Sequence, residues 1–242
     1  FMSGHSKWST IKRQKGTADI KRGNLFTKLS NAIIVAVKQG NGIVDPESNF
    51  KLRLAIDRAR ASNMPKENIE RALERAKGGA VGSVEEVIYE GFGPGGVALL
   101  IEAVTDNKLR TVSEIKNVFG KNSGSLGNPG SVSHLFKKKG VVAAKKSGMS
   151  SDELLSKGID ANVEDMEEED GQVIYYVDLS QMSLTKKALE SQGLEIVSAE
   201  IIYEPMSLSP QDEGIQSQIL NLVDKLEELD DVQKVHTNLG SD

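Results

Sequence analysis

Charge is distributed very unevenly along this chain of 242 residues, and the imbalance limits how the chain can fold. Residues 1–79 hold 16 of the 30 Lys and Arg but only 7 of the 35 Asp and Glu, a net charge of +9. Because the whole chain carries −5, residues 80–242 carry −14. Such opposed fields are costly to keep in one compact body unless the basic part faces a polyanion. The sequence therefore predicts a separate basic region, with nucleic acid as its first candidate partner.

The basic region has the pattern of short helices. Apolar residues recur at helical spacing from Leu25 to Val37 and again from Leu52 to Ala59. A third helix is expected to begin near Pro65, since proline suits the first turn of a helix, and to stop at Gly78. Residues 3–22, which we call the arm, carry almost no apolar stripe. We expect the arm to be extended or loosely helical.

From residue 84 onward, apolar runs of strand length alternate with amphipathic helices. The predicted order is β-β-α-β, then β-α-β-α-β, then α-β, which indicates two small α+β domains. The last helix and strand can complete the first of them. We therefore predict an α+β fold of three domains: a basic helical domain (2–79), a discontinuous α+β domain (80–136 and 205–242), and an inserted α+β domain (137–204), the last two ferredoxin-like.

Four local patterns give more detailed predictions. Thr111 and Glu114 have the spacing of a capping box at the start of a helix. Residues 132–136 read as a short strand, and the acidic stretch 164–170 reads as a solvated loop. The pair Ser209-Pro210 is expected to cap the long helix that follows it.

Sequence motifs give little support for an enzyme or a cofactor site. Residues 91–96 match the dinucleotide pattern G-x-G-x-x-G, but an apolar, strand-like run follows where the phosphate-binding mechanism needs a helix. This pattern is better interpreted as a hairpin turn that needs positive φ angles. There is no Cys, and the three His lie more than 100 residues apart, so no spacing suggests a metal site. We predict a protein that is not an enzyme and that takes no cofactor, metal or small-molecule substrate.

The location is predicted from what the sequence lacks. No apolar run approaches the roughly 20 residues of a membrane helix, so no membrane partner is expected. The absence of Cys fits a reducing compartment. We interpret the protein as cytoplasmic.

The basic cluster is the candidate binding site. Seven Lys and Arg fall within the first 28 residues beside one acid, Asp19, and several cations acting together can displace the counterions of a polyphosphate. Two flat rings in the arm could stack on exposed bases. The predicted nucleic-acid-binding residues are His5, Lys7, Trp8, Lys12, Arg13, Lys15, Lys21, Arg22 and Lys28 in and after the arm, with Lys51, Arg53, Arg58 and Arg60 on the second helix.

Several motifs of this chain resemble the YebC family. They include Gly4-His5-Ser6-Lys7-Trp8, Phe26-Thr27-Lys28-Leu29, Asn63-Met64-Pro65-Lys66-Glu67-Asn68, Tyr89-Glu90-Gly91-Phe92-Gly93-Pro94-Gly95-Gly96-Val97 and Leu229-Asp230-Asp231-Val232-Gln233. The resemblance covers nearly the whole chain. It implies a three-domain fold and a non-enzymatic, cytoplasmic regulator of gene expression. Bacterial members are commonly labelled DNA-binding transcriptional regulators, whereas mitochondrial relatives are translational activators.

The chain departs from the family pattern at three positions. Leu109 stands where the family usually has Asn, and His236 and Leu239 stand where aromatic residues are common. These departures concern a loop after a strand and the C-terminal strand, and they leave the basic cluster unaffected.

Three functions stay open. An arm with one Trp and dispersed cations, without an identifiable recognition helix, favours RNA and a translation factor that binds ribosomal RNA on the ribosome. The Arg-rich helix near residues 51–60 could instead read duplex DNA in a transcriptional regulator, since Arg suits guanine edges in the major groove. The acidic α+β half could serve as a protein-interaction module.

Overall fold

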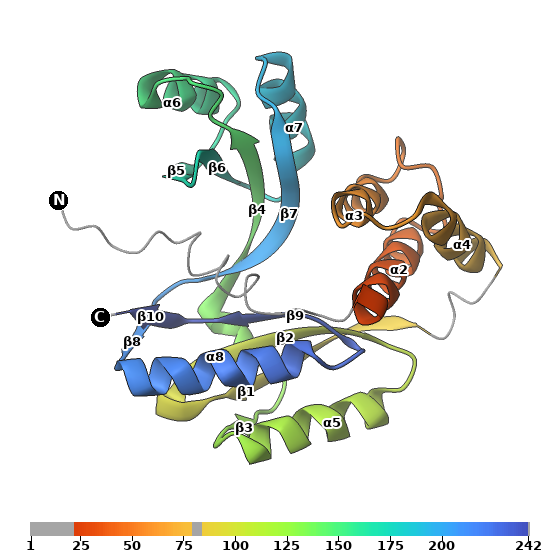
Figure 1. Cartoon of the computed structure of the whole chain (residues 1–242), viewed down its shortest axis with the longest axis vertical. Helices are drawn as coiled ribbons and strands as arrows, with labels where there is room; N and C mark the ends of the chain where they lie inside the picture. The colour runs from red at the N-terminus through yellow and green to blue at the C-terminus, as the bar shows by residue number, and fades with distance from the viewer. Residues whose placement is uncertain (1–21, 79–83, 242) are drawn as a thin grey trace. The chain divides into compact units, whose positions relative to one another are not determined.

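The computed structural model describes residues 22–78 and 84–241. Within this range the chain forms two compact units (Figure 1). One unit is Phe136–Glu204, and the other contains the described residues up to Leu135 together with those from Pro205 onward. Helices and antiparallel sheets occur in the same chain, so the predicted α+β class is confirmed. The limits of the three predicted domains remain a proposal.

The basic region folds into three helices, as the apolar periodicity predicts: α2 (Arg22–Gln39), α3 (Phe50–Ala61) and α4 (Lys66–Lys77). Asn49 caps α3 by accepting a hydrogen bond from the Leu52 backbone N–H, and its amide also donates to the Ala36 carbonyl of α2. Pro65 is the N-cap of α4, and Gly78 is its C-cap. The facing stripes bury one shared core that includes Ile33, Leu52 and Ile69.

A four-stranded sheet of order β3-β1-β2-β9 forms the body of the same unit. Its strands are β1 (Glu85–Phe92), β2 (Ala98–Thr105), β3 (Ser125–Leu126) and β9 (Val232–Thr237). Helices α5 (Lys108–Lys121) and α8 (Glu213–Glu227) pack on one face, where Phe119 and Leu222 join the core of the sheet (Figure 1). Strand β9 pairs with β2 although the inserted unit lies between them in sequence, as the α+β prediction with an insertion requires.

The glycine pattern at residues 91–96 forms the hairpin turn between β1 and β2, which are antiparallel. Gly95 and Gly96 have φ angles of 69° and 74°, and the turn closes as one short 3₁₀ segment, Pro94–Gly96. The interpretation as a turn with positive φ is confirmed. Strand β2 follows directly, so no helix N-terminus faces these glycines.

Two predictions in this unit are wrong. Helix α5 begins at Lys108 with Asn107 as its cap, because the Asn107 side chain accepts the Arg110 backbone N–H; Thr111 therefore lies inside the helix. Residues 132–136 form a 3₁₀ turn (Ser133–Leu135) and the start of the next strand. The Glu90 carboxylate accepts hydrogen bonds from the backbone N–H groups of Val132 and Ser133. These N–H groups therefore have a side-chain partner in place of a neighbouring strand.

The unit Phe136–Glu204 has the order β4 (Phe136–Lys145), α6 (Ser151–Asp160), β5 (Asp165–Glu169), β6 (Gln172–Val177), α7 (Met182–Ser191) and β7 (Ile196–Pro205). Its sheet order is β5-β6-β4-β7, the ferredoxin-like arrangement. Ser150 and Glu153 form a complete capping box at α6. Both helices pack on the same face of the sheet. The Tyr175 hydroxyl of β6 donates to the Leu154 carbonyl of α6, and Gly140 of β4 lies against Met182 of α7.

Two further predictions are corrected here and near the C-terminus. The acidic stretch forms the edge strand β5, whose backbone pairs with β6 from Asp165 to Glu169. Charged side chains are common on edge strands because they discourage pairing with other chains. Ser209 and Pro210 belong to a short strand, β8 (Ser209–Gln211), that pairs with β10 (Leu239–Ser241); Asp212 caps α8 instead.

Candidate nucleic-acid interface

Most of the predicted binding residues fall outside the described part of the chain. These are His5, Lys7, Trp8, Lys12, Arg13, Lys15 and Lys21, and Arg22 begins α2 with its side chain also outside it. The described part shows five of the predicted cations: Lys28, Lys51, Arg53, Arg58 and Arg60. Their placement decides which of them can reach a phosphate.

Lys28 lies on the buried side of α2 and is only 5 % exposed. Its ammonium donates a hydrogen bond to the Glu227 carbonyl at the end of α8. Burial lowers the pKa of Lys28, although the nearby charges of Glu227 and Asp230 act in the opposite direction. Lys28 therefore links α2 to α8. Because its ammonium is buried in this contact, Lys28 does not belong to the candidate interface.

The four cations of α3 differ in how they are held. Arg53 donates to the carbonyl oxygens of Pro46 and Glu47 and pairs with the Glu47 carboxylate at 3.0 Å, so it fixes the loop before α3. Arg60 approaches Asp57 only at 3.9 Å, and Lys51 donates to Gln39 across to α2. Arg58 is exposed and makes no hydrogen bond or ion pair with another residue of the described ranges.

These cations also lie on two different sides of α3. With about 3.6 residues per turn, Lys51 and Arg58 lie on one flank, and Arg53 and Arg60 lie about half a turn away on the other. The buried stripe of Leu52, Ile56 and Ala59 runs between the two flanks. The helix therefore presents two separate basic edges instead of one basic face.

The sequence reasoning missed a further exposed cation on α4. Arg75 is exposed and has no ion pair within the described ranges, whereas Lys66 and Lys77 pair with Glu70 and Glu74 on the same helix. The acidic and basic residues of α4 nearly balance, so the charge of this helix does not single out Arg75. Its position four residues after Arg71, on the exposed side of an amphipathic helix, is the signal that could have found it.

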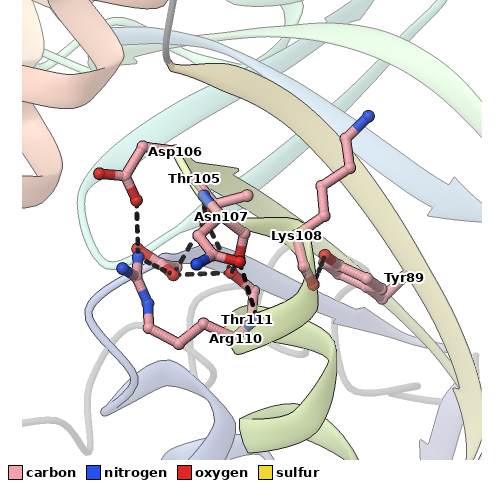
Figure 2. Close-up of polar contacts among 8 residues, drawn as sticks. Tyr89, Thr105, Asp106, Asn107, Lys108, Arg110 and Thr111 are labelled. Carbon is pink, nitrogen blue, oxygen red and sulfur yellow. Dashed lines mark hydrogen bonds and ion pairs between the residues drawn. The ribbon is translucent and has the colours of Figure 1, made fainter.

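A second polar cluster fixes the turn between β2 and α5 (Figure 2). Asp231, directly before β9, is 8 % exposed and accepts hydrogen bonds from the Arg110 guanidinium, the shorter at 2.8 Å. The Thr105 and Thr111 hydroxyls lie 3.1 and 2.7 Å from the same carboxylate. The same Nη2 atom of Arg110 also donates to the Asp106 carboxylate at 3.0 Å. The hydrogen bond and charge of Asp231 raise the pKa of Arg110.

This cluster holds an exposed tip in place. Lys108 and Leu109 form the first turn of α5, and Leu109 is 81 % exposed. The Tyr89 hydroxyl reaches the Lys108 carbonyl at 3.4 Å and steadies the tip from β1 (Figure 2). The sequence reasoning assigned Thr111 to a cap and did not find this cluster, because Asp231 lies 120 residues away in the chain.

The described residues offer little for other classes of site. Across residues 22–78 and 84–241, no three His, Asp or Glu side chains are grouped so that they could hold a metal ion. In the same ranges, none of the helices has the length and apolar character needed to cross a bilayer.

Comparisons with known proteins cover nearly the whole chain. Residues 6–79 match the family model described as the TACO1/YebC protein N-terminal domain, and residues 84–239 match the TACO1/YebC second and third domain. A probable transcriptional regulatory protein of Dehalococcoides mccartyi is 49 % identical over 242 residues, covering 100 % of this chain and 96 % of the relative. A protein of the same description from Chloroflexus aurantiacus is 48 % identical, covering 98 % and 95 %.

A solved structure is also similar. The crystal structure of a conserved hypothetical protein from Aquifex aeolicus superposes with a TM-score of 0.86 at 42 % sequence identity, covering 98 % of both chains. The similarity therefore extends to the whole fold.

Proposed function

This chain belongs to the TACO1/YebC family, and from that premise we propose that it is a non-catalytic regulator of gene expression that binds nucleic acid in the cytoplasm. In the favoured mechanism it is a translation factor that binds ribosomal RNA through the arm and the exposed cations of α3 and α4. One observation carries this proposal: residues 1–79 have a net charge of +9 within a chain of net charge −5. A polyanion is the partner that such a segregated charge suits best.

The arrangement of α3 supports RNA over duplex DNA. A helix that reads the major groove presents its base-contacting side chains on one face. In α3 the cations lie on two opposite flanks, and Arg53 is engaged in the loop before the helix. Dispersed cations that follow a backbone from several elements suit the irregular shape and single strands of folded RNA better.

A second candidate function is regulation of transcription on duplex DNA. The relatives from Dehalococcoides and Chloroflexus are both named probable transcriptional regulatory proteins, and this naming is the observation that favours it. The exposed Arg58 and Arg75 could contact DNA phosphates in that case. Specific binding would then need symmetric half-sites and a dimer, or base contacts from the arm.

A direct competition tests the proposal. Limiting protein is offered labelled ribosomes and labelled genomic duplex fragments together at about 150 mM salt, where weak non-specific binding is largely screened. We expect preferential capture by ribosomes. Selective retention of a few duplex fragments would establish the transcriptional alternative, and capture by neither would contradict both.

A further inference from the structure

The outer edge of β1 is only partly paired. In the sheet order β3-β1-β2-β9, the two-residue strand β3 lies against Gly91 and Phe92, and the Gly127 N–H donates to the Glu90 carbonyl at 2.7 Å. After Gly127 the chain leaves the sheet. Within the described part of the chain, no strand pairs with residues 86–89 on this side. We call residues 86–89 on this side the β1 edge, which continues the line of β3.

The backbone of the β1 edge points outward at alternate residues. Gly93 donates to the Val97 carbonyl across the hairpin, so the odd-numbered residues of β1 bond to β2. Glu86 and Ile88 therefore direct their N–H and C=O groups away from β2. None of these groups has a backbone partner among the described residues. Such a row of groups is a template for an added strand.

The side chains of the β1 edge allow pairing. Edge strands are commonly protected by charge, as in β5, where four of the five residues are acidic. On the β1 edge, three uncharged residues, Val87, Ile88 and Tyr89, follow Glu86, and Ile88 is 37 % exposed. Charge therefore protects β5 along its whole length but protects only the start of the β1 edge.

Helix α5 runs along β1 on one face of the sheet. At its start, Lys108 pairs with Glu85 at 2.9 Å, and the Tyr89 hydroxyl donates to the Lys108 carbonyl (Figure 2). Toward its end, the Phe119 ring lies where a Cβ of Gly91 would be. The first half of α5 therefore accompanies the β1 edge, and its second half accompanies the part of β1 that β3 covers.

The flank of α5 that lies beside the β1 edge is apolar. Arg110 and Glu114 line a hollow with Leu229, just after the end of α8, so their flank of α5 faces α8. With about 3.6 residues per turn, Leu109 and Val112 lie on the other flank. Leu109 is largely exposed and Val112 partly exposed. Because α8 bonds to β9 on the far side of the sheet, this second flank lies toward the β1 edge.

The opposite face of the β1 edge carries an acid. Side chains alternate along a strand, so Glu86 and Ile88 point away from the face that α5 covers. The Glu86 carboxylate accepts a hydrogen bond from the Gln39 amide at 2.5 Å and pairs with no cation of the described residues. A Lys or Arg on an added strand would neutralise Glu86, and its aliphatic stem would cover Ile88.

We propose that the β1 edge binds an extended segment of a protein partner, added as a strand in line with β3. The segment is amphipathic: its apolar side chains face Leu109 and Val112, and its Lys or Arg side chains face Glu86 and Ile88. Backbone hydrogen bonds supply affinity, and the alternation selects the partner. A second copy of this chain is less suitable, because antiparallel pairing of two β1 edges places both Glu86 carboxylates on one face at diagonal positions.

Amide hydrogen exchange measured by NMR on the full chain tests the site residue by residue. The probe is a peptide of four Lys-Val repeats, acetylated and amidated, at about 150 mM salt, where weak attraction between exposed charges is screened. Without peptide, the N–H groups of Val87 and Tyr89 should exchange slowly and those of Glu86 and Ile88 quickly. Saturating peptide should slow Glu86 and Ile88 several-fold and leave Val87 and Tyr89 unchanged.

Two outcomes of this measurement would overturn the proposal. The first is no change at Glu86 and Ile88 with saturating peptide. The second is slow exchange of both N–H groups without peptide, since the edge would then already be covered. If that protection rose with protein concentration, a second copy would be the occupant.

A matched peptide separates strand pairing from charge attraction. Full N-methylation of the Lys-Val peptide keeps its positive charges and removes its N–H donors. We expect this peptide to give no protection at Glu86 and Ile88. Equal protection by the two peptides would contradict strand addition.

Substitutions test the two faces of the site. Leu109→Ser should weaken binding of the Lys-Val peptide several-fold, and Leu220→Ser, which changes a 37 % exposed leucine on α8, should leave it unchanged. Glu86→Lys should weaken the Lys-Val peptide and strengthen a Glu-Val peptide, whereas Glu190→Lys on α7 makes the same charge change elsewhere as a control. Equal effects of variant and control, in chains with native circular dichroism, would overturn the assignment of that face.

This site is separate from the proposed nucleic-acid interface. The β1 edge includes none of the cations of α3 and α4, and every measurement omits nucleic acid. A failure of the proposed function would therefore leave these results unchanged.

Discussion

At the scale of single residues, Glu90 shows how one carboxylate can shape a loop. It is 6 % exposed, and it accepts backbone N–H groups from Gly130 at 2.7 Å and Ser133 at 2.8 Å, with Val132 between them. Burial alone would raise the pKa of Glu90, but these three donors outweigh it and hold the pKa below its ordinary value. The loop from 130 to 133 therefore depends on an ionised Glu90.

Glu90→Gln is expected to lower the free energy of unfolding at pH 7 by about 1–3 kcal/mol, because the amide NH₂ faces donors that it cannot satisfy. A depressed carboxyl pKa contributes stability above the unfolded pKa of about 4.5 and loses it as pH falls through the folded pKa. The difference between the two proteins should therefore shrink below about pH 4.5 in urea titrations. A difference that stays constant from pH 7 to pH 3 would contradict this account.

Asp106 and Asp231 bind the same guanidinium, that of Arg110, in different environments. The Asp231 side chain is 11 % exposed and the Asp106 side chain 56 %. Asp231→Ala should lower the free energy of unfolding by about 1–3 kcal/mol, since Thr105 and Thr111 lose a buried acceptor. Asp106→Ala is the matched control, and its melting temperature should change little because exposed ion pairs contribute little. Equal effects in thermal melts would show that burial does not decide the strength of this cluster.

Arg58 and Arg53 on α3 form another matched pair. Arg58→Ala removes an exposed cation, so we expect weaker RNA binding and a salt slope reduced by about 0.7 for a single strand. Arg53→Ala should instead lower stability, by about 1 kcal/mol, and leave the slope unchanged, because Arg53 is held by Pro46 and Glu47. Filter binding across a salt series measures both slopes. The assignment of Arg58 to the interface would be wrong if its variant kept the wild-type slope.

At the scale of elements, packing decides whether a glycine can be replaced by alanine. A Cβ at Gly91 would lie 2.6 Å from the Phe119 ring and 2.7 Å from the Ser125 carbonyl oxygen, so α5 and β3 both exclude a side chain there. Gly120, within α5, has no atom within 4 Å of such a Cβ. The same chemical change should therefore have opposite effects at the two positions.

Gly91→Ala is expected to destabilise the protein by about 1–3 kcal/mol through overpacking. Gly120→Ala should stabilise it by about 0.4–1 kcal/mol, because alanine reduces the freedom of the unfolded chain at a helical position. Denaturant titration of both variants checks the signs. Two destabilised variants would indicate that α5 is intolerant of change for a different reason.

Apolar periodicity predicted most elements, and long-range partners decided the exceptions. Strands 173–177 and 232–237 and the three basic helices follow from spacing alone. Strand β5 could not be predicted in this way, because Asp165–Glu169 has no apolar alternation and becomes a strand by pairing its backbone with β6. Likewise, Asn107 takes the capping position expected for Thr111, whose hydroxyl is drawn to Asp231.

At the scale of the whole molecule, charge segregation makes a prediction about binding. Reversing Lys7, Lys12, Arg13 and Lys15 to Glu should abolish nucleic-acid binding, because each lost phosphate contact lowers the salt slope by about 0.7–0.9. The control reverses four exposed lysines outside the basic region, Lys116, Lys121, Lys137 and Lys187, for the same change in net charge. Electrophoretic mobility shifts and circular dichroism separate binding from unfolding. Equal losses in both variants would show that total charge, and not its location, governs binding.

The sequence by itself determined the fold class, most helices and strands, the basic N-terminal region and the family resemblance, because periodicity and charge are local or additive properties of a chain. The tertiary structure alone decided which cations are available and what the acidic residues do. Lys28 lies in the basic cluster by sequence but donates to the carbonyl of Glu227, 199 residues away, and is buried. The acidic residues Asp165–Glu169 become the edge strand β5 only through backbone pairing with β6. Such partners depend on contacts between distant segments, which local spacing does not specify.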